Sequence, residues 1–240
     1  MGKGYKGVPC VYCNARVAAT ADHVIARGFF PEDKRGDLPK VPACSECNNA
    51  KSKLEHTLTA IMPFGAQHTH AGQALAMTGH RLGKNRKLHD ALAAGVAYTV
   101  RSVNGGPWQF EMTVPINNRD IEKLCEFMVR GLAQHHWRVD LGPDHFVRAS
   151  FLNEAGRHRF DSFFTGAGAN VQQNLGNGVF TYEGVQSQDC PELTLWKMSI
   201  YGAEVGGDKS QPGERSTVVY GLSVPRKWPA CAMLMEILGK

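Results

Sequence analysis

Apolar and polar residues follow one pattern up to about residue 95 and another beyond it. Residues 96–103 and 108–114 alternate as strands do, and the turn sequence Asn104-Gly105-Gly106-Pro107 separates them. Apolar residues then recur three and four positions apart from Ile121 to His136, which predicts an amphipathic helix capped by Asn118 or Asp120. Further strand-like runs follow at 146–152, 158–164, 179–182, 193–201 and 217–224. The pattern predicts an α+β fold with a mostly antiparallel sheet.

The first 95 residues lack long apolar runs. Residues 28–42 are rich in Gly, Pro, Asp and Lys, which predicts a loop. A helix-compatible composition begins at Ser45, and we expect that helix to end before Pro63. Residues 63–95 predict a basic, partly helical connector. Three parts are therefore expected: a small module at 1–62, the connector at 63–95 and an α+β domain at 96–240.

Composition and charge narrow the functional classes. The 240 residues are 42% hydrophobic and 20% charged, as in globular proteins. No run approaches the roughly 18 apolar residues of a membrane span, and the first 20 residues lack a signal-peptide pattern. We therefore expect a soluble, cytoplasmic protein with reduced thiols and no membrane partner.

The net charge of +5 is unevenly spread along the chain. Residues 1–90 hold 13 Lys and Arg against 7 Asp and Glu, whereas residues 91–240 hold 14 against 15. The basic excess in the first part favours a polyanionic partner, nucleic acid above all. An ordinary solvated surface would have the same composition.

Four of the seven cysteines form two Cys-x-x-Cys pairs, Cys10/Cys13 and Cys44/Cys47. Two such pairs can complete a tetrahedral four-cysteine zinc site. Such a site is closed, because all four ligands come from the protein, and its Zn²⁺ would be structural. The other three are unpaired in sequence and are expected in the core: Cys125, Cys190 and Cys231.

A second motif surrounds the cysteine pairs. Asp22-His23-Val24-Ile25 follows the first pair, and Asn48 directly follows the second within Pro-Ala-Cys-Ser-Glu-Cys-Asn-Asn-Ala-Lys. Over about residues 9–56 this arrangement resembles the HNH endonuclease family, more narrowly its zinc-stapled ββα-metal form. The resemblance implies a hairpin whose first strand ends in Asp-His, and a helix opened by Cys-x-x-Cys-Asn. It also implies metal-dependent hydrolysis of DNA phosphodiester bonds, which leaves 5′-phosphate and 3′-hydroxyl ends.

The sequence departs from that family in the loop before the helix. The family usually carries an Asn there that helps to orient the hairpin, and residues 24–47 contain none. Asp37 or main-chain groups are the alternatives for this support.

The chemistry of the motif can also be argued from its residues. Histidine has an ordinary pKa near 6.5 and can accept a proton from water at neutral pH, so His23 is the candidate general base. Asp22 and Asn48 offer hard oxygen ligands that suit catalytic Mg²⁺ or Mn²⁺. Adjacent strand residues point to opposite faces, so Asp22 and His23 share one site only if the strand ends or twists there, or if metal and base approach from different sides.

Other residues of the predicted helix and loops are candidates for substrate contact. Lys51 and Glu55 share a helix face with Asn48, and His56 lies beside it, as the last histidine of the motif or as a helix cap. Phosphate contact, without base-specific readout, is expected from the basic residues Arg27, Lys34, Arg35, Lys51, Arg81, Lys84, Arg86 and Lys87.

Two other functions fit the same sequence. The chain could be a zinc-stabilised module that binds nucleic acid without catalysis. It could also be a nuclease subunit that a partner complex activates, for example in antiviral defence. Residues 96–240 are then a core-forming domain or a recognition surface for nucleic acid or a partner protein.

Overall fold

The chain opens with a two-stranded hairpin followed by three helices. The computed structural model describes residue 5 and residues 7–65, 71–102, 106–164, 168–203, 205–206 and 215–237. The first elements are β1 (Thr20–His23), β2 (Lys40–Ala43), α1 (Ser45–Ile61), α2 (Ala71–Lys84) and α3 (Arg86–Gly95). β1 and β2 pair antiparallel, which places Asp22 opposite Val41 and His23 opposite Lys40.

The rest of the chain builds the larger part of the fold. Its helices are α4 (Asn118–Trp137), α5 (Glu154–Phe164) and α6 (Cys231–Ile237). Its strands are β3 (Ala97–Arg101), β4 (Gln109–Thr113), β5 (His145–Ser150), β6 (Ala169–Leu175), β7 (Phe180–Gln186), β8 (Thr194–Ile200), β9 (Val205–Gly206), β10 (Arg215–Ser216) and β11 (Val219–Pro225).

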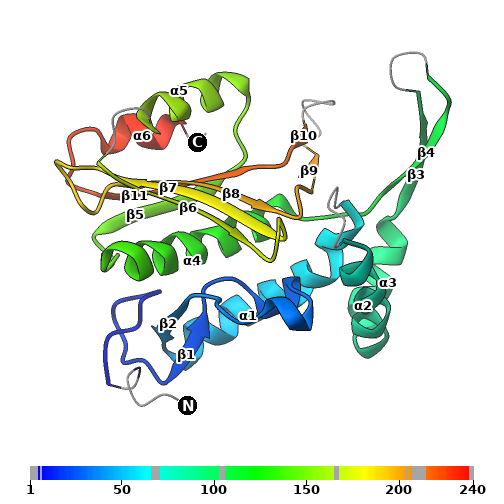
Figure 1. The fold of residues 1–240 in the computed structure, drawn as a ribbon, viewed down its shortest axis with the longest axis horizontal. Helices are drawn as coiled ribbons and strands as arrows, with labels where there is room; N and C mark the ends of the chain where they lie inside the picture. Colours follow the sequence, from blue (N-terminus) through cyan, green and yellow to red (C-terminus); the bar gives the residue numbers. More distant parts are fainter. Residues whose placement is uncertain are drawn as a thin grey trace.

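A five-stranded antiparallel sheet in the order β5-β11-β8-β7-β6 forms the central layer. Helix α4 covers one face of this sheet, and α5 and α6 cover the other (Figure 1). The β1–β2 hairpin and α1 lie on the far side of α4 from the sheet, so α4 is sandwiched between them (Figure 1). The β3–β4 hairpin projects away from this body beside α3 (Figure 1).

The first module and the later domain share one hydrophobic core. This cluster joins Val24 and Phe29 to Met128 of α4 and to Trp196 of the sheet. Gly131 allows α4 to approach the hairpin closely, because a Cβ at this position would lie 2.7 Å from Val24 Cγ1. Such an approach is tolerated only by glycine. The position of the segment after His23 therefore depends on the later domain.

Most of the predicted elements are confirmed. The helix from Ser45 ends before Pro63, the amphipathic helix is α4, and four of the strand-like runs correspond to β5, β7, β8 and β11. The two strands beyond residue 95 form β3 and β4, although Asn104 and Gly105 of their turn lie outside the described residues. The predicted caps of α4 are wrong, because it is Asn117 whose side chain accepts a hydrogen bond from the Arg119 N–H, at 3.0 Å.

One predicted strand is wrong, and strands β6, β9 and β10 were not predicted. Residues 158–164 lie in helix α5, whose start is capped by Asn153, because the Gly156 N–H donates to its side chain at 2.8 Å. Phe160 and Phe164 are four residues apart, a spacing that fits a helix face as well as a strand face. Strand β6 is polar and lies at the sheet edge, so it lacks the alternating apolar signal of a half-buried strand.

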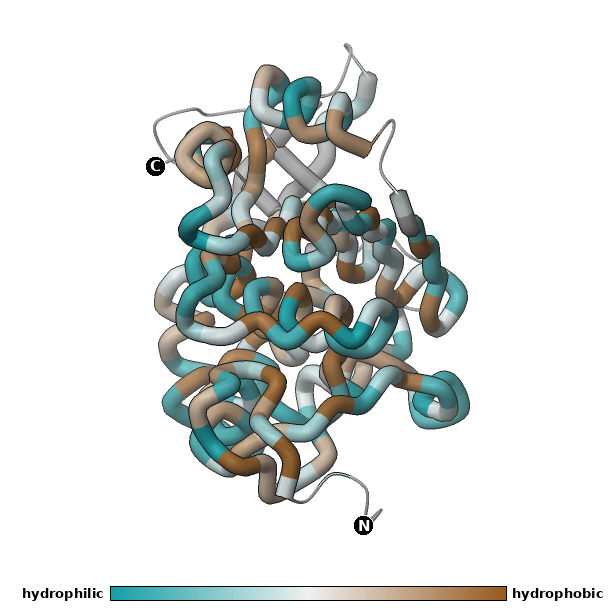
Figure 2. Tube along the Cα trace, turned by 90° about the vertical axis from the view of Figure 1, so that its left-hand side faces the viewer, coloured by the Kyte–Doolittle hydropathy of each residue, from teal (hydrophilic) through white to brown (hydrophobic). Residues whose placement is uncertain are grey.

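Hydropathy along the chain agrees with this layering. Polar and apolar residues alternate within the helices, so that one side of a helix can face the core (Figure 2). The three cysteines outside the Cys-x-x-Cys pairs are buried in the core, as expected. Among the described helices, none has the length and apolar character needed to cross a membrane.

Candidate active site and cysteine cluster

The four paired cysteines come together next to the hairpin. Their sulfur atoms all lie within 4.8 Å of one another, close to the sulfur–sulfur separation of about 3.8 Å that tetrahedral Zn–S bonds of about 2.3 Å require. The cluster could therefore hold a metal ion such as Zn²⁺. Among the described residues, it is the one group of three or more His, Cys, Asp or Glu residues with this geometry.

Both Cys-x-x-Cys segments are fixed by main-chain contacts. The first is attached to β2 by a hydrogen bond from the Val11 N–H to the Pro42 carbonyl, at 3.0 Å. The second opens α1, where the Cys44 sulfur accepts a hydrogen bond from the Cys47 N–H at 3.4 Å. Burial works to raise the pKa of Cys44, but this contact and its other hydrogen bonds prevail and lower it to about 7. Burial raises the pKa of Cys10 and of Cys47 instead, so Cys44 is more acidic than these two thiols.

Asp22 and His23 end the first strand of the hairpin. Asp22 is buried, whereas His23 is half-buried. Burial is the main cause that lowers the pKa of His23 below its ordinary value, and the cations Lys40 and Arg27 lower it further. His23 is therefore neutral at pH 7, with both of these cations on the exposed surface around it.

Lys51 contacts both Asp22 and His23 and is completely buried. Its ammonium donates to the His23 carbonyl at 2.7 Å, contacts Asp22 Oδ2 at 3.0 Å and pairs with the Glu55 carboxylate. The expected contact between Lys51 and phosphate is therefore wrong, because this side chain has no exposed surface. Glu55 belongs to the same buried group, and burial raises its pKa although Lys51 opposes that shift.

Tyr12 is a site residue that the sequence did not reveal. It lies between Cys10 and Cys13, and its hydroxyl donates to Asp22 Oδ2 at 2.6 Å. Burial, together with the nearby Asp22 charge, raises the pKa of Tyr12 well above its ordinary value, so it remains a donor. Its position inside a cysteine pair was the only sequence signal for this role.

Asn48 lies in the first turn of α1, half-buried, one residue after the second cysteine pair. Lys51 and Glu55 follow it at positions three and seven residues further along, so α1 brings all three to its hairpin side. His56 is exposed, and its Nε2 lies 3.1 Å from the side-chain nitrogen of Asn85, the residue that caps α3. His56 thus joins α1 to α3.

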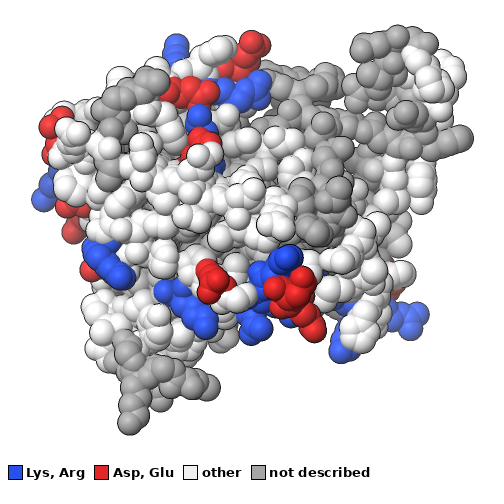
Figure 3. Space-filling view, in the orientation of Figure 1, with Lys and Arg blue, Asp and Glu red and all other residues white. Residues whose placement is uncertain are grey.

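The remaining basic residues divide into two groups. Arg35 donates to the Phe30 carbonyl at 3.0 Å, and Arg81 donates to the carbonyls of Thr59 and Gly28 at 2.8 and 2.7 Å. These two guanidinium groups are thus engaged within the fold. The others have exposed or half-exposed side chains: Arg27, Lys34, Lys84, Arg86 and Lys87. Lys and Arg atoms occur along the lower half of the face in Figure 3, over the first module, mixed with acidic groups.

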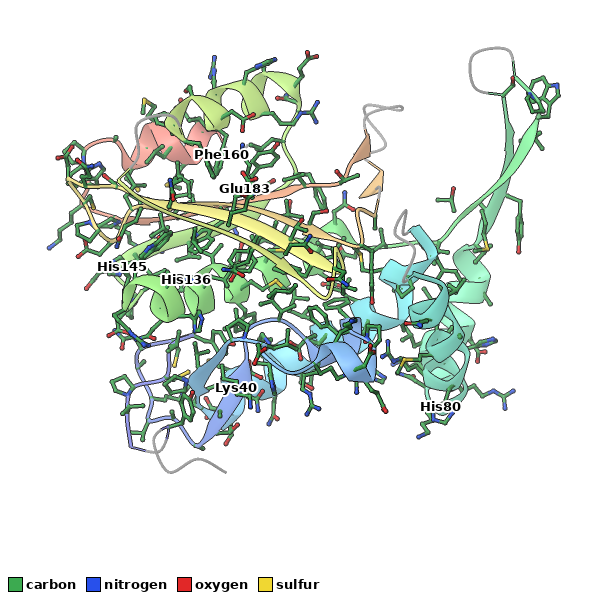
Figure 4. The ribbon with its side chains drawn as sticks, viewed as in Figure 1. Lys40, His80, His136, His145, Phe160 and Glu183 are labelled. Atoms are coloured by element: carbon green, nitrogen blue, oxygen red, sulfur yellow. The ribbon has the colours of Figure 1, made fainter. Side chains whose placement is uncertain are left out.

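The loop between His23 and β2 is held by main-chain contacts as well as by the Arg35 and Arg81 side chains. The Val24 N–H donates to the Pro39 carbonyl at 2.8 Å, next to the Lys51 contact with the His23 carbonyl. Asp37 is exposed. Figure 4 shows Lys40 at the hairpin, whereas His136 lies on α4 and His80 lies on α2, away from the hairpin.

Comparisons of the chain with protein-family models, with characterised proteins and with solved structures gave no match. The interpretation of the site therefore rests on its residues and their geometry.

Proposed function

We propose that the protein is a metal-dependent endonuclease of the HNH type, which hydrolyses phosphodiester bonds in DNA. The observation that carries this proposal is the position of His23. It is a half-buried, neutral histidine at the end of a hairpin strand, beside a buried carboxylate and near the exposed cations Lys40 and Arg27. A general base, an acidic metal ligand and groups that bind phosphate are the parts such a reaction needs.

His23 would take the proton from the attacking water, since its lowered pKa keeps it neutral at pH 7. Arg27 and Lys40 would hold the phosphate backbone on the same surface. In this account the four cysteines hold structural Zn²⁺, which fixes the hairpin against α1 and takes no part in the chemistry.

Asp22 and Asn48 would hold the catalytic Mg²⁺ or Mn²⁺. Tyr12 and Lys51 both contact Asp22 Oδ2, so among the contacts of the described residues Oδ1 is left open. The Asp22 side chain keeps 11% of its surface exposed, so a cation could reach it from solvent. An open carboxylate oxygen and a half-buried amide fit a hard divalent cation. When bound, the cation would polarise the scissile phosphate and neutralise the leaving oxygen.

Asp22→Asn tests this assignment. The variant keeps the size of the side chain but removes the charge that attracts a cation, so we expect the DNA cleavage rate to fall by about 100-fold or more. The dependence on Mg²⁺ concentration should also shift to higher concentrations. Single-turnover cleavage of supercoiled plasmid over a Mg²⁺ titration measures both effects. An unchanged rate and an unchanged Mg²⁺ dependence would exclude Asp22 as a ligand.

The pH dependence of cleavage tests the role of His23. The reaction needs the neutral imidazole, so the rate should decline only below the ordinary histidine pKa of 6.5. Lys40→Gln removes a cation that lowers the pKa of His23, and the acid limb of the profile should then move to higher pH. The matched control is Lys53→Met, an exposed lysine of α1. If the limb stays in place in Lys40→Gln, a group other than His23 sets it.

A nuclease that acts with a partner complex is the second candidate. The β3–β4 hairpin favours it, because Tyr98 and Trp108 are 72% and 73% exposed and Val100 is 52% exposed. Tyr98 and Val100 lie on one face of β3, and the exposed Met112 is the cross-strand partner of Tyr98. Exposed apolar faces of this kind are typical of interaction sites. Activity that appears only after a partner is added would select this candidate.

A further inference from the structure

The buried ammonium of Lys51 holds the two neighbouring residues of the candidate site together. Fully buried lysines are rare unless they are paired. Lys51 has 0% exposure, and its ammonium has three oxygen partners. It donates to the His23 carbonyl and the Glu55 carboxylate, and it forms an ion pair with Asp22 Oδ2. Two of these three partners belong to consecutive residues at the end of β1.

This arrangement answers the question of how Asp22 and His23 can serve one site. Their side chains leave the strand in opposite directions, so the strand end must be fixed for both to be aligned. β1 has four residues and pairs with β2 alone, and two-stranded hairpins are marginal by themselves. The Lys51 ammonium nitrogen contacts the side chain of Asp22 and the main chain of His23. This single atom therefore fixes the orientation of both residues.

Glu55 offsets the positive charge that Lys51 brings to Asp22. The formal charges of Asp22, Lys51 and Glu55 leave the group with one negative charge. Without Glu55, the ammonium would neutralise Asp22 and reduce its attraction for a divalent cation. Tyr12 adds a second donor to Asp22 Oδ2 from within the first cysteine pair. Both segments tied by the cysteines therefore contribute a donor to the same carboxylate oxygen.

We propose that Lys51 is a positioning residue, which aligns Asp22 and His23 for the reaction while Glu55 offsets its charge. This inference rests on the proposed nuclease function and assigns to that site a residue that touches neither substrate nor metal. A simple role in stability would involve the same contacts, so the test must separate alignment from folding and from charge.

The double variant Lys51→Met, Glu55→Gln provides that separation. It removes one positive and one negative charge, so the net charge of the group is the same as in the wild type. Both new side chains have nearly the size of the old ones, and an uncharged pair often replaces a buried ion pair without loss of stability. Lys53→Met is the control, because Lys53 is exposed on the same helix.

Two readouts on the zinc-loaded chain of 240 residues decide the proposal. The first is the NMR signal of the His23 ring, which is assigned by its absence in His23→Ala. This readout does not depend on activity. The second is the single-turnover rate of plasmid cleavage, because a catalytic group that is misplaced by about 1 Å can lower this rate by about 100-fold. We expect the double variant to shift the His23 signal and to lower the rate, with zinc content and melting temperature kept, while Lys53→Met changes neither readout.

An unchanged His23 signal would overturn the proposal, and so would a shifted signal with the wild-type rate. If the wild type does not cleave DNA, the nuclease function fails, and the His23 signal alone decides whether Lys51 sets the geometry of the pair. If the double variant loses its zinc, the single variant Glu55→Gln replaces it in both measurements. It keeps a side-chain oxygen that can accept from the ammonium but removes the charge that offsets it. The His23 signal should therefore shift and the rate should fall, and no change in either would overturn the proposal.

Discussion

His23→Ala is expected to lower the single-turnover rate of DNA cleavage by about 10²- to 10⁴-fold, the usual contribution of a general base. The loss follows from the position of His23 at the end of β1, where no other histidine of the described residues shares the hairpin. The half-buried ring is not among the buried residues of the core, so the variant should keep its fold and its zinc.

His80→Ala is the matched control for this substitution. His80 is exposed on α2, away from the hairpin, and its removal should leave the rate at the wild-type value. Equal rates for His23→Ala and the wild type would remove His23 from the mechanism. A fall in both variants would indicate a general effect on DNA binding.

Cys44→Ser is expected to release the zinc and to unfold the hairpin and the start of α1. Structural Zn²⁺ contributes about 10–16 kcal/mol to the folding of small zinc domains, and this module has only a two-stranded hairpin and one helix around the cluster. Because its residues join the shared core, we expect the melting temperature of the whole chain to fall by at least about 10 °C. Metal analysis and thermal melting measure the two effects.

Cys190→Ser is the control for the zinc prediction. Cys190 is also buried, but it contacts Glu192 and does not belong to the four-cysteine cluster, so this variant should keep one zinc ion per chain. A Cys44→Ser protein that still holds one zinc ion and melts at the wild-type temperature would contradict the structural role. Loss of zinc should also disturb Asp22, since Tyr12 lies between the two cysteines of the first pair.

The cysteine cluster and the order of its elements could be predicted from the sequence. The spacing of the cysteines alone predicted the two pairs, because two residues between cysteines allow both thiolates to bind one metal ion from a tight turn. The resemblance of the motif to HNH endonucleases placed the Asp22-His23 pair at a strand end, and Pro63 marked the end of α1. These features depend on local sequence, which is why local reasoning found them.

The environment of Lys51 could not be predicted in the same way. Its spacing from Asn48 gave the helix face but not what that face contacts, and a lysine on a helix is usually solvated. Its burial depends on the hairpin, on Tyr12 and on Glu55, which come together only in the folded chain. Helix α5 was missed for a related reason, since Phe160 and Phe164 fit two periods and the Asn153 cap decided between them.

The most direct test of the account is a cleavage assay with the zinc-loaded wild-type protein and supercoiled plasmid, in Mg²⁺, in Mn²⁺ and in a chelator that spares the zinc. We predict nicked or linear DNA with either cation and intact plasmid in the chelator. The ends should carry 5′-phosphate and 3′-hydroxyl groups, so that ligase can reseal them. Salt-sensitive binding with intact plasmid under every condition would contradict the account and leave a zinc-stabilised module that binds nucleic acid.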